Sequence, residues 1–422
     1  MKYHSITVHF LYGFFYFLLY SPTLKKNKMR ILFTILLITF FSNLSYGQSK
    51  KDIIIGKRFA IKSEILNSDR EISIYLPNSY NNNDYVNYPV LYLLDGRKFF
   101  HPFTGAVAQM SSDASPQIPE MIVVGITSQD RLKDSSPTRS MIGYSGKEEK
   151  GLEISGGAND FIKFIEKELI PYIDNNYRTN NYRIFSGYSF TGLPILQALF
   201  TKPELFNSYL VIDFSAWWDN EVTLKNLEKF FKEYNGTYKD VYIATVDRVE
   251  NTVYPEKANL TWRFIQKFEQ LHPYNIGLGY KKYGYKEENH HTMPLVSFMD
   301  GMKYLFRGYM INYDEMYTNP TLIKKRFDKL SDRLGYKVFL REELANYFGY
   351  QFLYTIKDLD KAFFYFKYNT ENYPSSSNTW DSLAEFYMLK GDKKKAIEYY
   401  EKALEFNTKN TDIKKRLEEL KN

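Results

Sequence analysis

Between residues 70 and 310, short apolar runs alternate with longer segments whose apolar residues follow a helical period. The central runs are uninterrupted and bounded by turn residues, which is typical of strands buried on both faces of a sheet. The strand candidates are residues 71–76, 90–94, 121–126, 183–186, 207–213 and 240–245. The clearest helical segments between them are residues 158–177 and 224–234. This alternation predicts an α/β fold with a mostly parallel sheet, helices on both faces and chemistry in loops at the carboxyl ends of the strands.

From about residue 313 onward the pattern is helical throughout, and a period of 34 residues appears. Seven of the eight signature positions of a tetratricopeptide repeat are occupied once, by Trp380, Leu383, Ala384, Tyr387, Ala396, Tyr400 and Ala403. One period earlier the matching residues are Ala362, Phe366 and Pro374. We therefore predict a small all-α module at residues 313–422, with repeats at about 343–376 and 377–410. Two repeats alone bury little surface, so we expect them to dock on residues 313–342 or on the preceding domain, residues 48–312.

Two apolar runs open the chain, at residues 10–20 and 31–41, and four basic residues separate them. The second run has the features of a secretory signal: a basic flank, an apolar centre, and small residues at Ser45 and Gly47 before a cut at Gln48. Met29 is a possible true start. A hairpin of two membrane helices is the alternative, but both runs are shorter than the roughly 20 residues that span a bilayer. We expect residues 1–47 to be a cleaved targeting segment and the mature protein to be periplasmic or secreted.

The formal net charge of +7 comes largely from that same segment. Five basic residues and no acidic ones lie before residue 48, so removing the segment leaves a charge of +2 without a basic block. A near-neutral body argues against a nucleic-acid partner. The chain has no cysteine, which excludes a thiol nucleophile, disulfides and a Cys-ligated zinc.

A candidate nucleophile follows the predicted strand at residues 183–186. Gly187-Tyr188-Ser189 is the first half of the elbow G-x-S-x-G, with Thr191 at the usual place of the last glycine and Gly192 after it. A serine hydroxyl becomes nucleophilic when a sharp strand-to-helix turn holds it beside a base. In such a turn the next amide, that of Phe190, donates to the developing oxyanion. The alternative is that Ser189 is an ordinary serine in a strand–helix turn without a catalytic role.

The base requires a histidine, and four lie beyond the targeting segment. His101 precedes Ser189, whereas hydrolases of this fold run in the chain order serine, acid, histidine. His272 stands at the end of a predicted helix, where it suits the helix dipole. His290 and His291 lie in a polar loop before an apolar helix, which is the expected place of the base. We expect no metal here, because no carboxylate or third histidine joins the pair at ligand spacing.

The acid of the triad is expected after the predicted strand at residues 240–245. Asp247 and Glu250 both qualify by position, and Asp247 is nearer to the end of the strand. Either carboxylate would hold the imidazole in the required tautomer and stabilise the imidazolium. We therefore predict Asp247 as the acid, with Glu250 as the alternative.

The candidate nucleophile, base and acid belong to a longer series of motifs that follow one another in a fixed order along the chain. The markers are residues 88–96 (YPVLYLLDG); residues 122–126 followed by Arg131, Asp134 and Pro137; residues 168–173 (ELIPYI); Gly187-Tyr188-Ser189; Trp217-Trp218; and residues 291–294 (HTMP) before 301–306 (GMKYLF). In this order they resemble the putative esterase family of α/β-hydrolases, which includes esterase D-like enzymes and the enterobactin (ferric siderophore) esterases. The resemblance covers about residues 52–308.

The resemblance implies an α/β-hydrolase sheet and an esterase activity without a cofactor. The active histidine of the family stands three residues before the proline, which implies that His291 is the base. The segment Asp95-Gly96-Arg97 is implied to face the pocket, with the Arg97 amide as a second oxyanion donor. The chain also departs from the family, because Tyr188 replaces a histidine, Thr191 replaces a glycine, and Asp213-Phe214-Ser215 replaces Ser-Pro-Ser.

Two functions follow from these observations. The first is an exported serine esterase in which Ser189 attacks, His291 transfers the proton and Asp247 orients His291, acting on a small-molecule ester. The second is a catalytically degenerate hydrolase that binds a protein partner through its repeats, which the departures from the family motivate. The sequence favours the esterase.

Overall fold

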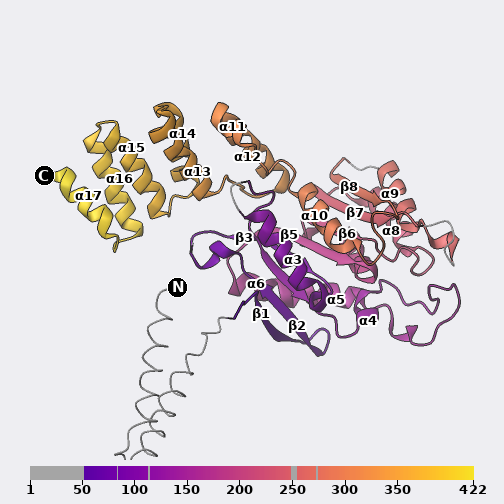
Figure 1. The fold of residues 1–422 in the computed structure, drawn as a ribbon. Coiled ribbons are helices and arrows are strands. Elements are labelled where there is room, and N and C mark those ends of the chain that lie inside the picture. Colours follow the sequence, from indigo (N-terminus) through magenta and orange to yellow (C-terminus); the bar gives the residue numbers. More distant parts are fainter. Residues whose placement is uncertain (1–51, 83, 113–114, 249–253, 272–273) are drawn as a thin grey trace, which may run out of the picture. The chain divides into compact units, whose positions relative to one another are not determined.

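The structure is a computed structural model that describes residues 52–82, 84–112, 115–248, 254–271 and 274–422 (Figure 1). Its sheet has eight strands: β1 (Lys57–Ser63), β2 (Ser68–Tyr75), β3 (Tyr88–Leu93), β4 (Ile122–Ile126), β5 (Thr179–Tyr188), β6 (Ser208–Ile212), β7 (Lys239–Val246) and β8 (Ile276–Tyr283). Their spatial order is β1-β2-β4-β3-β5-β6-β7-β8. Strands β1 and β2 pair antiparallel, as do β2 and β4, and the remaining pairs are parallel. The predicted mostly parallel sheet is confirmed.

Helices cover both faces of the sheet. They are α3 (Gly96–Ser111), α4 (Arg131–Ser135), α5 (Ala158–Phe164), α6 (Ile170–Asn176), α7 (Gly192–Thr201), α8 (Val222–Glu233), α9 (Leu260–Leu271) and α10 (Met293–Leu305). Apolar residues of α3 and α10 pack on one face, and those of α5 to α9 pack on the other. Every residue of β3, β4, β6 and β7 is buried, which explains why these strands are mostly apolar without alternation.

The C-terminal part of the chain is helical, as predicted. Its helices are α11 (Tyr313–Thr318), α12 (Pro320–Leu334), α13 (Glu342–Tyr350), α14 (Leu359–Asn372), α15 (Ser377–Leu389), α16 (Lys393–Phe406) and α17 (Thr411–Lys421). The pairs α13–α14 and α15–α16 coincide with the two predicted repeats, and α17 packs on α16. At the second repeat, Leu383, Ala384, Tyr387, Ala396, Tyr400 and Ala403 are buried, while Trp380 stacks on Tyr399 at 5.8 Å between ring centroids.

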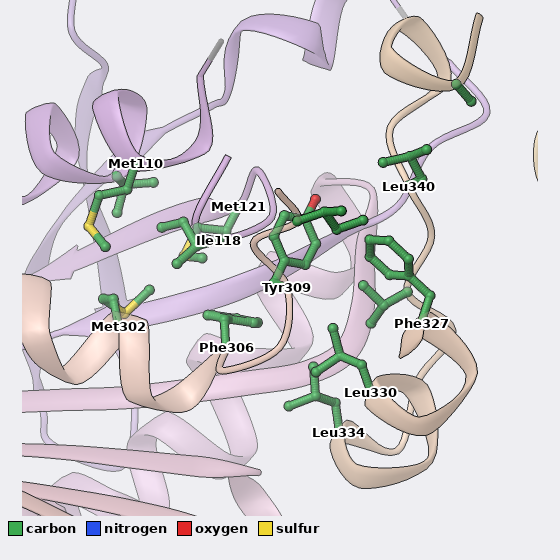
Figure 2. Close-up of a cluster of buried hydrophobic side chains, with 14 of the residues drawn as sticks. Met110, Ile118, Met121, Met302, Phe306, Tyr309, Phe327, Leu330, Leu334 and Leu340 are labelled. Carbon is green, nitrogen blue, oxygen red and sulfur yellow. The ribbon is translucent and has the colours of Figure 1, made fainter. Parts of the chain in front are cut away.

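Helix α12 joins the helical region to the sheet domain through apolar contacts and an ion pair. Figure 2 shows Phe327, Leu330 and Leu334 of α12 facing Phe306 and Tyr309, which follow α10. The Tyr309 and Phe327 rings meet edge to face at 5.7 Å. This core joins α12 to the sheet domain. The first repeat contacts α11, since the rings of Phe348 and Tyr317 lie 5.1 Å apart between centroids, as expected of a repeat that docks on residues 313–342. The division at residue 312 stays a prediction.

A buried carboxylate completes this junction. Asp240 of β7 is 2% exposed and accepts from Arg307 Nη2 over 2.9 Å, and it also pairs with Arg333 of α12. Arg333 in turn donates to the carbonyl oxygens of Leu305 and Arg307, each over 3.0 Å. A buried carboxylate requires such pairing, so we expect loss of either arginine to destabilise the junction.

The predicted targeting segment lies outside the described residues. Among the helices that the structure does describe, none combines the length and apolar character needed to cross a bilayer. Glu250 and His272 also lie outside the described residues.

Candidate active site

The nucleophile elbow is a strained turn between β5 and α7. Ser189 has a φ of 57°, in the left-handed region that a serine seldom adopts. A β-carbon on Gly187 would lie 2.3 Å from the Thr191 carbonyl oxygen, and one on Gly192 would lie 2.5 Å from Phe214 Cβ. Both positions therefore require glycine. A strained serine that tight packing holds in place is the arrangement expected of a nucleophile elbow.

Thr191, at the usual glycine position, ties this elbow to the neighbouring loop. Its hydroxyl accepts from the Tyr188 N–H over 3.0 Å and donates to Asp95 Oδ2 over 2.9 Å. Asp95 is also held by Arg131, whose Nε and Nη2 donate to its two oxygens over 2.9 and 3.0 Å. Because Asp95 immediately precedes α3, this network brings the start of α3 next to Ser189.

The side chain of His290 reaches Ser189. Its Nε2 lies 3.1 Å from Ser189 Oγ, and its Nδ1 lies 2.6 Å from Asp213 Oδ2. His290 belongs to a turn between β8 and α10, in which Asn289 Oδ1 accepts from the amides of His291 and Thr292 over 2.9 and 3.3 Å. An imidazole that bridges a hydroxyl and a carboxylate in this way is the geometry of a serine hydrolase triad.

Asp213 occupies the first position after β6. Its side chain is 0% exposed, and its φ of 40° turns the backbone sharply at the end of the strand. Besides His290, the carboxylate accepts from Thr245 Oγ1 over 2.8 Å and from Arg248 Nη2 over 2.9 Å. A carboxylate that is buried away from solvent is stable only when donors such as these compensate its charge.

The structure does not bring two of the expected triad members, His291 and Asp247, into contact with Ser189. The side chain of His291 is exposed, and its ring centroid lies 5.3 Å from that of His290. It is His290 that contacts Ser189. Asp247 is 45% exposed and pairs with Lys282 Nζ over 2.8 Å. The structure therefore brings together Ser189, His290 and Asp213.

Sequence reasoning missed Asp213 because it looked for the acid one strand too far along the sheet. Strand β6 pairs directly with β5, with Val211 opposite Gly187 and Ile212 opposite Tyr188. The residue after Ile212 is therefore next to Ser189. The available signal was an aspartate directly after a buried strand, at a position where the resembling family has a serine.

Tyr188 also contacts the candidate base. Its hydroxyl donates to the His290 carbonyl oxygen over 2.7 Å, and its ring lies 4.8 Å from the imidazole between centroids. Burial raises the pKa of Tyr188 to about 12, so the phenol remains a hydrogen-bond donor at neutral pH. Both contacts fix the position of His290.

The two expected oxyanion donors come from two elements, the elbow itself and the start of α3. Phe190 follows Ser189 directly, and Arg97 is the second residue of α3, where helix amides lack intrahelical acceptors. The Arg97 guanidinium points elsewhere, because its Nε and Nη2 each donate to Glu71 over 2.9 Å. This pairing lowers the pKa of Glu71 to about 2. Any role of Arg97 at the oxyanion would thus fall to its amide.

Half-buried aromatic rings extend from Phe190 along the loops at this edge of the sheet. Phe190 lies 6.4 Å from Trp217, Trp217 lies 5.3 Å from Tyr144, and Tyr144 lies 5.2 Å from Tyr254 between ring centroids. The Lys257 ammonium lies over Tyr144 at 5.1 Å. The Tyr144 ring meets those of Trp217 and Tyr254 edge to face. We call these four rings the aromatic wall.

A cavity of about 650 Å³ lies elsewhere, at the amino ends of two central strands, and is lined by Tyr88 and Thr179 at the starts of β3 and β5. It lies away from Ser189, which follows the carboxyl end of β5. Within the part of the chain that the structure describes, no three His, Cys, Asp or Glu side chains are grouped to hold a metal ion.

Comparisons with known proteins agree with this fold. Residues 63–249 match the model of the putative esterase family, and residues 377–410 match a tetratricopeptide repeat. The ferri-bacillibactin esterase BesA of Bacillus subtilis is 31% identical over 175 residues, which are 39% of this chain and 60% of the relative. The siderophore triacetylfusarinine C esterase of Aspergillus fumigatus is 28% identical over 156 residues, 34% of this chain and 49% of the relative. The chain thus spans about half to three fifths of these two curated relatives.

Solved structures extend the similarity in fold. An IroE-like serine hydrolase from Shewanella oneidensis superposes with a TM-score of 0.68 at 29% identity, covering 75% of this chain and 99% of that one. An uncharacterised protein from Capnocytophaga ochracea gives a TM-score of 0.57 at 19% identity and covers 87% of this chain and 99% of that one. The expected resemblance, an α/β-hydrolase sheet followed by a helical region with a tetratricopeptide repeat, is confirmed.

Proposed function

From the match of residues 63–249 to the putative esterase family, we propose that the chain is a serine esterase, a carboxylic-ester hydrolase in which Ser189, His290 and Asp213 form the catalytic triad. The observation that carries the proposal is the imidazole of His290, which bridges Ser189 Oγ and the buried Asp213 carboxylate. The names of the relatives, which are siderophore esterases, support the reaction class.

In the proposed mechanism, His290 Nε2 removes the proton from the Ser189 hydroxyl as its oxygen attacks the ester carbonyl. The resulting tetrahedral intermediate places its negative charge beside the amides of Phe190 and Arg97. His290 then gives the proton to the leaving alcohol, and the acyl group remains on Ser189. A water molecule, deprotonated by His290, releases the acid and restores the serine. Asp213 holds His290 with Nδ1 protonated and stabilises the imidazolium.

The departures from the family pattern fit this mechanism better than a loss of function. Thr191 bonds to the backbone of the elbow and to Asp95, and Tyr188 bonds to the carbonyl of His290. Asp213, which replaces the serine of the family, supplies the acid. For this reason we place the esterase before the catalytically degenerate interaction protein.

The test of the esterase is hydrolysis of p-nitrophenyl acetate and butyrate by the purified chain, together with labelling by a fluorophosphonate probe. We expect both, and we expect Ser189→Ala to abolish both while circular dichroism stays unchanged. An active Ser189→Ala variant, or a parent chain that neither hydrolyses nor reacts, would refute the proposal.

For the substrate, we propose a siderophore ester, as the names of the relatives suggest. The aromatic wall, which begins at Phe190 next to Ser189, supports an ester with an aromatic group, because aromatic rings favour contact with one another. We expect ferric bacillibactin to be cleaved with a higher kcat/KM than p-nitrophenyl butyrate. The reverse order would remove the siderophore from this proposal and leave the esterase in place.

We also propose that the protein is exported, because residues 1–47 have the features of a cleavable targeting segment. Cell fractionation and N-terminal sequencing test this, with Gln48 as the expected first residue.

Further, we propose that the tetratricopeptide repeats bind a protein partner. Cross-linking of the full chain in cells, compared with a chain carrying surface substitutions in α15, tests that role.

A further inference from the structure

The cavity of about 650 Å³ away from Ser189 lies where the sheet domain meets the helical region. One wall is formed by the amino ends of β3 and β5 and the loop before β3, at residues 85–89 and 179–181. The other wall is the segment between α12 and α13, residues 335–343, together with residues 372–375 at the end of α14. Small-molecule sites enclose roughly 300–1,000 Å³, so this cavity has the size of a binding site. The hydrolytic mechanism does not use it.

The carboxylates that line the cavity already accept hydrogen bonds from the protein. Glu342 is 8% exposed, and its two oxygens accept from the Tyr85 hydroxyl over 2.6 Å and from Ser376 Oγ over 2.8 Å. Both oxygens of Glu120 accept from Ser79, one from its amide and one from its hydroxyl. These charges are therefore compensated without a ligand.

The cations of the cavity are also accounted for. Arg341 donates from Nη1 to the Ser111 carbonyl oxygen over 2.9 Å and lies 3.7 Å from the carboxylate of Glu343. Lys337 is exposed, so water solvates its ammonium. The lining thus holds three carboxylates and two cations, a difference of a single charge. A lining so close to neutrality favours an uncharged ligand over an ion.

Two tyrosine hydroxyls of the lining, by contrast, have no partner. Tyr309 is 4% exposed, and its hydroxyl makes no hydrogen bond to any residue that the structure describes. Figure 2 shows this hydroxyl directed away from Phe306. The hydroxyl of Tyr336 is buried and also lacks a partner among the described residues. Burial raises the pKa of both phenols, so both remain donors at neutral pH, and a ligand that accepts from them would offset the cost of their burial.

Amides and aromatic rings complete the lining. Asn180 Oδ1 accepts from the Tyr182 amide over 2.9 Å, and Asn372 Nδ2 donates to the Tyr368 carbonyl oxygen over 2.7 Å. The opposite end of each amide remains for a ligand, which gives one donor and one acceptor. Half-buried tyrosine rings lie on both walls, at positions 85, 336 and 373. A sugar suits such a lining, because its hydroxyls both donate and accept and its C–H faces stack on aromatic rings.

We propose that this cavity binds an uncharged saccharide, held between the amino ends of β3 and β5 and the segment that leads into the first repeat. The inference goes beyond the esterase and does not depend on it. Its consequence is that a bound sugar contacts both the sheet domain and the helical region, and thereby stabilises the junction between them.

The experiment begins with a microarray of neutral and charged glycans probed with the purified chain, and calorimetric titration then gives the Kd of a neutral glycan that binds. We expect Tyr309→Phe and Tyr336→Phe each to raise this Kd by about 3–10-fold, the effect of one lost hydrogen bond. Neither variant should lower the Tm of the free chain, because neither hydroxyl bonds to the protein. Tyr347→Phe is the matched control, since Tyr347 is 47% exposed and lies outside the cavity, and should leave the Kd unchanged.

Limited proteolysis gives a second readout that locates the sugar. Lys337 is an exposed residue of the cavity wall, so trypsin can cleave after it in the free chain. The same glycan should slow this cleavage, and Tyr309→Phe should require a correspondingly higher concentration for equal protection. If one phenylalanine variant fails to fold, the other carries the test.

Three results would overturn the inference: no neutral glycan binds, only charged glycans bind, or the Kd is the same in the parent chain and in both phenylalanine variants. The last result would place the sugar elsewhere on the molecule. Binding requires no turnover, so these failures are separate from a failure of the esterase. Ser189→Ala should bind the glycan as tightly as the parent chain does.

Discussion

Two neighbouring loops each present an aspartate just past a buried strand, yet the two carboxylates have opposite surroundings. Asp213, after β6, is fully buried and accepts from His290, Thr245 and Arg248. Asp247, after β7, is 45% exposed and pairs with Lys282. The same residue type at the same place on adjacent strands thus has one environment suited to a triad and one typical of a surface ion pair.

Pairing along the sheet explains the difference. Strand β6 lies directly beside β5, so the residue after Ile212 is next to Ser189. Strand β7 lies one position further out, and the Asp247 amide continues the pairing to β8 by donating to the Tyr283 carbonyl oxygen over 2.7 Å. The Asp247 side chain is thereby directed to Lys282 of β8 instead of the elbow. Distance from the nucleophile strand, more than the type of residue, separates these two loops.

The largest expected effect concerns the histidine that joins the loop after β6 to the elbow. We expect His290→Ala to lower kcat/KM for p-nitrophenyl butyrate by about 10⁴–10⁶, because Ser189 loses its base. His291→Ala is the matched control and should change kcat/KM by less than about threefold, since its side chain is exposed. A large loss of kcat/KM in His291→Ala with a small loss in His290→Ala would show that His291 is the base, as the sequence predicts.

The next effect compares the two aspartates directly. We expect Asp213→Asn to lower kcat by about 10²–10⁴, because the amide can no longer hold His290 in the required tautomer. The variant keeps its size and should remain folded by circular dichroism.

Asp247→Asn provides the control for this comparison. It breaks only an exposed ion pair, so we expect its kcat to stay within twofold of the parent chain. Equal losses in the two variants would show that the loops after β6 and β7 do not differ in the way their burial indicates.

Much of this site follows from local sequence, and the rest from pairing across the sheet. The elbow at Ser189 is predictable, because a serine between a strand and a helix with glycines at 187 and 192 is a local pattern. Strands β3, β4, β6 and β7 are predictable for the same reason, because their apolar runs are buried on both faces of the sheet.

The two departures from the expected residues have different physical causes. Whether His290 or His291 faces Ser189 depends on a turn in which Asn289 Oδ1 accepts from two amides, two and three residues further along the chain. Whether Asp213 or Asp247 reaches the histidine depends on which strand pairs with β5. That pairing joins residues about 25 apart in the chain, so local sequence does not determine it.

A smaller effect is expected from the hydrogen bond that Thr245 of β7 donates to Asp213 in the loop after β6. Thr245 lies in β7 and donates from Oγ1 to Asp213 Oδ1 over 2.8 Å, at a site where both groups are buried. We expect Thr245→Val to cost about 1.5–3 kcal/mol in the free energy of unfolding, because a charged oxygen loses its donor without gaining water. Thr245→Ser retains the hydroxyl and should recover most of that loss. Urea denaturation followed by fluorescence measures both variants.

The smallest expected effect belongs to the loop after β7. Lys282→Met breaks the pair with Asp247, whose side chains are 28% and 45% exposed, so we expect a change of at most about 0.5 kcal/mol in the free energy of unfolding. Raising the salt concentration should reduce even this difference, because solvent ions screen exposed charges. A loss above about 2 kcal/mol, measured by the same urea denaturation, would mean that Asp247 is a buried structural carboxylate after all. In that case its distance from Ser189, and not its exposure, would be the property that keeps it out of the triad.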